Sequence, residues 1–421
     1  MAERLIFHVD VNSAFLSWEA VRRVRRGEPD LREIPSAVGG NRETRRGVIL
    51  AKSVPAKRFG VTTGEPVGMA LRKCPTLQLV EPDFKLYLQS SRAFMEICRR
   101  YAPVVEAYSI DECFLDMTGT HLLYPDPVEA AHRLRREIRD TLGFTVNIGI
   151  GPNKLLAKIA GDFEKPDRVH TLFAEELPQK LWPLSVDAML GVGKATAEAL
   201  HRLRLHTVGD VARLSEEQLQ ASFGQKLGRY LYRCSRGLDD SPVSDEPEEL
   251  KGYSVSTTTE QDVTDRKTAQ RLLLQLTDSV SARMRRDGAR ALGVAVKIRY
   301  ADFKNRSHQR KLDTPTDLTD EIYTVARRLL LELWDGETPL RLLGIGLFDI
   351  RHTADGEQLT LFEEDTHRRD RSRALDRTVD DLRARFGVQG VVRGSTLGSD
   401  GDALGKKHRA QLELTDEDMK E

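Results

Sequence analysis

Three acidic residues lie where short apolar segments end, and together they could bind metal ions. Asp10 follows the apolar run 5–9, and Asp111 and Glu112 lie between two strand-like segments. Successive residues of a strand point to opposite faces, so Asp111 and Glu112 can share one site only at a hairpin turn. Three carboxylates there form a hard, oxygen-rich ligand set suited to Mg²⁺. Two such ions could activate a hydroxyl nucleophile and neutralise a triphosphate, which predicts phosphoryl transfer.

The segments around these acids predict the elements that position them. Sequence patterns give a strand, two helices, a strand pair, a helix and a strand, at residues 5–9, 13–26, 82–100, 104–117, 127–142 and 144–150. This order predicts an α+β fold, with helices on one face of an antiparallel sheet. An Asp-Glu pair is common, however, and solvent-exposed turn acids are the alternative on this pattern alone.

The rest of the chain predicts further domains. Residues 184–238 are helical, and 239–250 have the prolines and acids of an exposed linker. A second α/β domain follows, with strands at 294–300 and 342–350 and helices near 265–287 and 317–334. The last 59 residues are highly charged. They predict one amphipathic helix and then a disordered tail, the apolar residues of the helix being Leu375, Val379, Leu382 and Phe386.

Length and composition limit the class of protein. A chain of 421 residues is too long for one core, and 39% apolar and 31% charged residues are typical of soluble globular domains. The chain contains no run of about 18 apolar residues, so no membrane span is expected, and the first residues do not resemble a signal peptide. The four cysteines are scattered without zinc spacing. We expect a cytoplasmic monomer with reduced thiols.

A basic cluster stands out because the net charge of the chain is zero. Between Ser281 and Lys311, ten basic residues face only two acids. A cluster of one sign predicts a nucleic-acid contact, and a solvated charged face is the alternative. The basic residues are Arg283, Arg285, Arg286, Arg290, Lys297, Arg299, Lys304, Arg306, Arg310 and Lys311.

Four motifs resemble those of the Y-family DNA polymerases, most of all the DinB or DNA polymerase IV branch. They occur in family order: HVDVNSAF at 8–15, GVILAKSVPAKRFGV at 47–61, SIDECFLD at 109–116, and NIGIGPNKLLAKIAGDFEKP at 147–166. The similarity extends from residue 5 to about 350. It implies a lesion-bypass enzyme of low fidelity and low processivity, which adds deoxynucleotides to a primer 3′-hydroxyl.

The resemblance assigns roles to individual residues. It implies two Mg²⁺ ions held by Asp10, Asp111, Glu112 and the backbone carbonyl of Val11. Phe15 matches the aromatic residue that excludes the ribose 2′-hydroxyl, although a core aromatic is the alternative. Lys165 matches the lysine that reaches the triphosphate, although most loop lysines are simply solvated.

The nucleotide pocket departs from the family pattern. Where the family has a Thr, a Tyr and an Arg for the phosphates, this chain has Ala51, Val54 and Lys57. Ala and Val cannot donate a hydrogen bond, and Lys lacks the fork of Arg. We expect lower nucleotide affinity or a slower chemical step, unless Lys52 or Arg58 compensates.

Two further segments predict contacts with DNA and with a partner protein. Gly191, Gly193 and Lys194 belong to a tight turn that begins a helix and resembles a helix-hairpin-helix, which grips DNA phosphates. The string QLTLF resembles a peptide that binds the sliding clamp, and a short edge strand is the alternative. Its matching residues are Gln358, Leu359, Leu361 and Phe362.

The resemblance implies the layout of a right-hand polymerase. We expect a palm at 1–11 and 76–166, fingers at 12–75, a thumb at 167–238, a linker at 239–250, a little finger at 251–351, and a tail at 352–421. The expected partners are primer–template DNA, dNTPs and the clamp. A catalytically inert adaptor that binds the clamp is the main alternative, although such relatives are expected to lack the acids. A nucleotidyl cyclase is the second, and it would leave the Gly-Val-Gly turn and the QLTLF string without a role.

Overall fold

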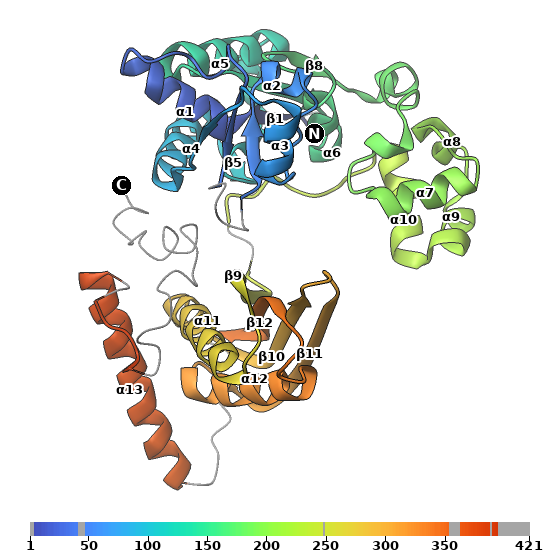
Figure 1. Cartoon of the computed structure of the whole chain (residues 1–421). Coiled ribbons are helices and arrows are strands. Elements are labelled where there is room, and N and C mark those ends of the chain that lie inside the picture. Colours follow the sequence, from blue (N-terminus) through green and yellow to red (C-terminus); the bar gives the residue numbers. More distant parts are fainter. Residues whose placement is uncertain (1–3, 41–46, 247–248, 353–362, 388–389, 395–421) are drawn as a thin grey trace. The chain divides into compact units, whose positions relative to one another are not determined.

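The computed structural model describes residues 4–40, 47–246, 249–352, 363–387 and 390–394 (Figure 1). These residues form two compact units, which are described separately here. The boundary between the units falls after Pro247, inside the segment that the sequence predicts as a linker. Within the described ranges, no helix is long and apolar enough to cross a membrane.

A five-stranded sheet in the order β5-β6-β1-β7-β8 lies at the centre of the first unit. Its strands are β1 (Ile6–Val11), β5 (Val104–Ala107), β6 (Glu112–Asp116), β7 (Val146–Gly151) and β8 (Val169–Thr171). The central strand β1 pairs antiparallel with β6 on one side and with β7 on the other. Only β7 and β8 run parallel.

Helices cover both faces of this sheet. The helices around it are α1 (Ala14–Arg25), α4 (Phe84–Arg99), α5 (Pro127–Leu142) and α6 (Lys154–Gly161). The apolar sides of α4 and α5 join Phe7 and Val9 of β1 in the main core. α6 packs against the opposite face, where its Ala157 joins Ile6 and Phe114. The predicted α+β class is therefore confirmed. The three helices predicted from the sequence share one face in the main core, and α6, which the sequence did not predict, covers the other face.

Glycines allow α6 to approach the sheet closely. A Cβ atom at Gly149 of β7 would lie 2.0 Å from the carbonyl oxygen of Ala157, and one at Gly151 would lie 2.9 Å from the Ala157 nitrogen. A Cβ at Gly161 of α6 would lie 3.1 Å from Nδ1 of His8. Glycine is the residue that permits such a contact between backbones. The side chains of α6 consequently reach the ends of β1 and β6.

A smaller three-stranded sheet lies in the segment between α1 and α4. Its strands are β2 (Ser36–Gly39), β3 (Ile49–Lys52) and β4 (Gln78–Val80), in the order β3-β2-β4. Two short helices accompany it, α2 (Val54–Arg58) and α3 (Val67–Lys73). Ile49, Ala56 and Val67 form part of a separate apolar core. Most of this segment falls within residues 12–75, which the sequence predicts as fingers, while β4 lies beyond that range.

The last part of the first unit, residues 184–238, is mainly helical, as its sequence pattern indicates. Its main helices are α7 (Lys194–Arg202), α8 (Val208–Ala212), α9 (Glu216–Phe223) and α10 (Gln225–Ser235). They enclose a small core that includes Leu200, Val211, Leu219 and Leu231. Thr207 and Ser215 begin α8 and α9 with capping boxes, which satisfy the backbone donors of these short helices.

The second unit is a four-stranded antiparallel sheet with two helices on one face. The strands are β9 (Gly252–Val263), β10 (Ala289–Tyr300), β11 (Asn305–Thr316) and β12 (Leu340–His352), in the order β11-β10-β12-β9. The helices are α11 (Arg266–Arg286) and α12 (Thr319–Leu333), which contact the sheet and each other. The core between them includes Leu276, Val280, Val296 and Ile322.

A further helix, α13 (Glu363–Phe386), is bound to the second unit by charge rather than by an apolar face. Asp376 is 4% exposed and accepts the backbone N–H of Thr319 at 2.9 Å, at the start of α12. Arg285 of α11 pairs with Asp376 at 3.3 Å and with Asp380 at 2.7 Å. In the predicted apolar face of this helix, Leu375 and Phe386 are 61% and 71% exposed. Of the α13 side chains whose burial is described, only the ion-pairing Asp376 is fully buried, while Val379 and Leu382 of the predicted apolar face are half-buried.

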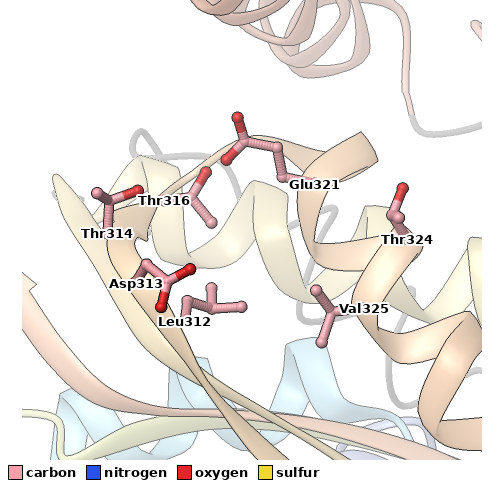
Figure 2. Close-up of a pocket in the computed structure, with 7 residues that line it drawn as sticks. All are labelled: Leu312, Asp313, Thr314, Thr316, Glu321, Thr324 and Val325. Atoms are coloured by element: carbon pink, nitrogen blue, oxygen red, sulfur yellow. The ribbon is translucent and has the colours of Figure 1, made fainter. Parts of the chain in front are cut away.

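A pocket of about 320 Å³ lies in the second unit between the end of β11 and the first turns of α12 (Figure 2). Leu312 and Val325 form its apolar floor, and Asp313 and Glu321 supply its acids. Glu321 is already paired with Arg369 of α13 at 3.0 Å. The pocket therefore lies beside the contact between α12 and α13.

Candidate active site

Strand pairing brings two of the predicted acids together. Asp10 of β1 lies directly opposite Glu112 of β6 in an antiparallel register. Directly opposed residues point to the same face of a sheet, here the face that carries His8 and α6. Asp111 lies in the turn before β6, and its carbonyl accepts the N–H of Val11 at 3.0 Å. All three acids thus lie at the same end of the β1–β6 pair, with Asp111 in the turn that the predicted shared site requires.

Glu112 is held by two donors from the covered face. His8 Nε2 lies 3.0 Å from its Oε2 atom, and the Lys158 ammonium of α6 pairs with the same oxygen. Burial alone would raise the pKa of Glu112, but these two groups lower it to about 2. His8 is only 1% exposed and Lys158 13% exposed, so solvent competes little with either contact.

Asp10 is held by a different lysine. It pairs with Lys165, which also pairs with Asp162 at 2.8 Å. Burial raises the pKa of Asp10, although the nearby Lys165 opposes part of this effect. Burial alone would lower the pKa of Lys165, but the two carboxylates raise it. The remaining acid, Asp111, accepts a hydrogen bond from the Ser109 hydroxyl at 2.7 Å.

The donor set suits a hard divalent cation, although the acids now have protein partners. Carboxylate oxygens at one strand end are the ligands that Mg²⁺ prefers. Among the described residues, no three or more His, Cys, Asp and Glu side chains converge as a metal site. Asp10 and Glu112 instead contact lysine ammonium groups, which are cations on flexible stems. A metal would bind carboxylate groups that also contact these lysines and Ser109 in the structure.

Phe15 begins α1 and lies on an aromatic support. Its ring stacks on that of Tyr87, with centroids 4.6 Å apart and an angle of 18°. The Tyr87 hydroxyl donates to Glu19 at 3.0 Å, and Glu19, which is fully buried, pairs with Arg22. Phe15 is only partly buried, so one side of its ring faces solvent. Stacking and the Tyr87–Glu19 bond fix the ring in place.

The predicted phosphate-binding positions lie on β3 and α2. Ala51 of β3 is 8% exposed, and Val54, at the start of α2, is 52% exposed. Lys57 is exposed on α2. Burial and then the charge of Lys57 lower the pKa of Lys52, which donates to Thr63 at 3.1 Å. Two neighbouring lysines whose positive charges repel each other can bind an anion between them. Of the two, only Lys57 is predicted from the sequence as a nucleotide-binding residue.

The Gly-Val-Gly turn leads into α7. Gly191 has φ 73°, and a Cβ there would lie 2.6 Å from the Tyr230 hydroxyl oxygen, so both conformation and space require glycine. Gly193 is the N-cap of α7, and no heavy atom lies within 4 Å of a Cβ built there. Lys194 is 90% exposed. The turn thus leaves room for a phosphate at backbone N–H groups and a lysine.

The basic cluster of the second unit divides into residues with different roles. Lys297 and Arg299 of β10 alternate with the buried Val296 and Ile298, so they point away from the helices. The prediction that Arg285 contacts DNA is wrong in this fold, because its side chain is 5% exposed and ion-paired to α13.

The other predicted DNA-contact residues lie at the margins of that sheet. Arg283 donates to the Ser254 carbonyl at 3.4 Å, and Arg286 pairs with Asp287 at 3.8 Å. Lys304 is 81% exposed in the β10–β11 turn. Arg306 lies over the ring of Tyr300, 5.6 Å from its centroid. The predicted clamp-binding residues Gln358, Leu359, Leu361 and Phe362 lie outside the described residues.

Sequence reasoning missed four residues around the site: His8, Lys158, Tyr87 and Glu19. His8 and Lys158 belong to the quoted motifs but carried no assigned role. Alternation along β1 could have found His8, since it lies two residues before Asp10 and shares its face. Glu19 interrupts an apolar helix face, which is a signal of a buried charge with a partner.

Comparison with known proteins identifies the family. Residues 9–162 and 250–361 match models described as the impB/mucB/samB family and its C-terminal domain, and 188–239 match the thumb domain of DNA polymerase iota. The chain is 38% identical over 395 residues to a DNA polymerase IV of Clostridium acetobutylicum, covering 94% of this chain and 98% of that one. It is 35% identical to one of Alkaliphilus oremlandii, covering 93% and 99%.

A solved structure, a Y-family DNA polymerase chimera, has the same fold, with a TM-score of 0.72 and 23% identity. That match covers 83% of this chain and 100% of the chimera. These similarities extend over nearly the whole length of the chain. The chain belongs to the Y-family DNA polymerases, among the relatives of DNA polymerase IV.

Proposed function

We propose that this chain adds deoxynucleotides to a primer 3′-hydroxyl by two-metal phosphoryl transfer, and that it acts on damaged templates. Its family makes it a DNA-directed DNA polymerase. The single observation that carries the mechanism is the register of Asp10 opposite Glu112, with Asp111 in the adjoining turn. This arrangement supports a site in which two carboxylates share a sheet face and the third reaches it from the turn.

The acids would hold the metal ions in this mechanism. Asp10, Asp111, Glu112 and the carbonyl of Val11 would be the ligands. Two bound Mg²⁺ ions would supply charge for the triphosphate and make the primer hydroxyl a better nucleophile. Lys165 pairs with Asp10 and is 39% exposed, so its ammonium can turn to an incoming phosphate. Lys52 and Lys57 supply further positive charge from β3 and α2, in place of the usual Thr, Tyr and Arg.

The sugar and the DNA have their own contacts in the proposal. Phe15, supported by Tyr87, would pack beneath the sugar and exclude a 2′-hydroxyl. Gly193 and Lys194 would bind a phosphate of the duplex. Lys297, Arg299 and Lys304 would follow the backbone from the second unit, and this binding should weaken steeply with salt.

Two properties of the proposal come from the family resemblance and from the QLTLF string. An open site that accepts damaged templates would make synthesis error-prone. The residues Gln358, Leu359, Leu361 and Phe362 would bind a sliding clamp and raise the otherwise low processivity. We expect the enzyme to work as a monomer.

Primer extension with Mg²⁺ and dNTPs tests the function. The wild-type chain should extend a primer, and Asp111→Ala/Glu112→Ala should not, although it should still bind primer–template DNA. A wild-type chain that fails to extend, even with a loaded clamp, would contradict the proposal. The inert adaptor would then be the better account, because Ala51 and Val54 offer no donors to a nucleotide.

A further inference from the structure

The contacts of Glu112 are unequal for its two oxygens. Both His8 and Lys158 bond to Oε2, and no hydrogen bond to Oε1 is found among the described residues. A carboxylate oxygen accepts two hydrogen bonds with its two lone pairs. Two donors therefore occupy Oε2, and Oε1 keeps its lone pairs for another ligand.

The fold fixes both donors. His8 lies two residues before Asp10 on the same face of β1, diagonal to Glu112 in the register. A carboxylate only accepts, so His8 Nε2 is the donor toward Glu112, and it also lies 3.5 Å from the Lys158 ammonium. Its Nδ1 is buried and has no hydrogen-bond partner among the described residues, next to Gly161.

Lys158 reaches Glu112 because α6 lies so close to the sheet. Its ammonium is also 5.1 Å from the ring centroid of Tyr108, which leaves the chain little freedom. One turn earlier on the same helix, Lys154 makes a parallel pair with Glu106 of β5, at 2.6 Å. The two lysines have the same chemistry and similar burial, but only Lys158 contacts an acid of the proposed metal site.

We propose that Lys158 and His8 are positioning residues, which hold Oε2 of Glu112 so that Oε1 is the oxygen that binds metal. The inference rests on the proposed function and adds the orientation of one ligand. Without the two donors, the carboxylate rotates freely and binds metal in unproductive ways. Lys158 also places a permanent positive charge beside the ligands, so its removal raises the negative potential of the site.

The test separates the rate of insertion from the binding of metal. Lys158→Met is expected to lower the single-turnover insertion rate by about 10- to 100-fold, at any Mg²⁺ concentration. Electron paramagnetic resonance measures Mn²⁺ binding to the complex of protein, dNTP and a dideoxy-terminated primer. The Lys158→Met chain should bind Mn²⁺ as tightly as the wild-type chain or more tightly. A merely structural role would weaken Mn²⁺ binding together with the rate, and that result would overturn the proposal.

Matched variants assign the effect to Glu112. Lys158→Arg and His8→Gln keep an N–H donor and should recover most of the rate that Lys158→Met and His8→Leu lose. Lys154→Met is the control for a lysine–carboxylate pair on the same helix and should insert as fast as wild type. In a Glu112→Gln chain, adding Lys158→Met should slow insertion no further, because the positioning acts through that carboxylate.

Two failures are distinguishable. If Lys158→Met inserts as fast as wild type while Asp111→Ala/Glu112→Ala is inactive, only the positioning inference is overturned. If Asp111→Ala/Glu112→Ala itself extends primers, the proposed metal site is wrong, and the inference fails with it.

Discussion

Each unit of this protein contains a cluster of ion pairs, and the two clusters differ in how many partners each charge has. At the end of β1 and β6, Asp10 and Glu112 pair with lysines, and within the described part of the chain each carboxylate has one oxygen without a hydrogen bond. Between α11, α12 and α13, Arg285 bonds to Asp376, Asp380 and Thr319 with a 5% exposed side chain. The first arrangement can exchange partners, and the second is fully satisfied. Only the first is suited to bind a ligand.

The two clusters also differ in the type of basic residue that they contain. Lysine is a compact point charge on a flexible stem, whereas arginine presents a planar fork of donors. The cluster of the first unit uses Lys158 and Lys165, which can release a carboxylate to another cation. The cluster of the second unit uses arginines, and Arg393 bonds to Asp278, Asp320 and Asp376 together. In these two clusters, lysines contact the acids of the proposed catalytic site, and arginines hold α13 on the second unit.

The largest expected effect on stability comes from breaking the ion-pair cluster of the second unit. Asp376→Ala removes a buried partner of Arg285 and the acceptor at the start of α12, whose own N-cap residue makes no side-chain bond. The loss should lower the free energy of unfolding of the second unit by about 3 kcal/mol. Urea denaturation measures this value. Asp381→Ala, on the exposed side of the same helix, is the control, and an equal loss there would contradict the account.

A smaller effect is expected when α6 is pushed from the sheet. At Gly149→Ala the new Cβ would lie 2.0 Å from a backbone carbonyl, so backbone must shift at a cost of about 1–3 kcal/mol. The shift moves Lys158 away from Glu112, and primer extension should fall even at temperatures where the chain is folded. Gly68→Ala, with open space at its Cβ, should be neutral or stabilising in thermal denaturation. Full activity of Gly149→Ala would show that the close approach is dispensable.

The smallest effect concerns an exposed acid and its pH dependence. Asp335 accepts bonds from the N–H groups of Glu337 and Thr338 and from the Thr338 hydroxyl, which lower its pKa to about 2. A lowered folded pKa stabilises the fold above the unfolded pKa, and this stability is lost as the pH falls. Wild type should therefore melt above Asp335→Ala at neutral pH, and the difference should vanish between about pH 4 and pH 2. A difference that persists at pH 2 would contradict this origin.

Strands with an apolar alternation were predictable, and polar ones were not. The sequence predicts strands that overlap β10 and β12, because both alternate or carry apolar runs. It misses β9 and β11, whose sequences GYSVSTTTEQDV and NRSHQRKLDTPT contain few apolar residues. β11 is an edge strand, and most of its residues are exposed. β11 forms a strand because its backbone pairs with β10, and this pairing is a tertiary contact that the local sequence does not reveal.

The site shows the same limit. Residue types and order make Asp10, Asp111 and Glu112 candidates, since the acids follow apolar runs, and the family resemblance assigned them the metal. The partners of these acids depend on the distance between α6 and the sheet, which the glycines determine only once both elements are folded. Arg285 was misjudged for a related reason, because charge along the sequence does not reveal that α13 covers it.

The most direct test of the central claim compares two acids on one sheet face. Asp10 and Glu106 both pair with a lysine, but only Asp10 belongs to the proposed metal site. Single-turnover insertion by Asp10→Asn should fall at least about 1,000-fold, equivalent to about 4 kcal/mol of barrier, while Glu106→Gln stays close to wild type. Equal rates for Asp10→Asn and the wild-type chain would contradict the claim that this strand end performs the chemistry.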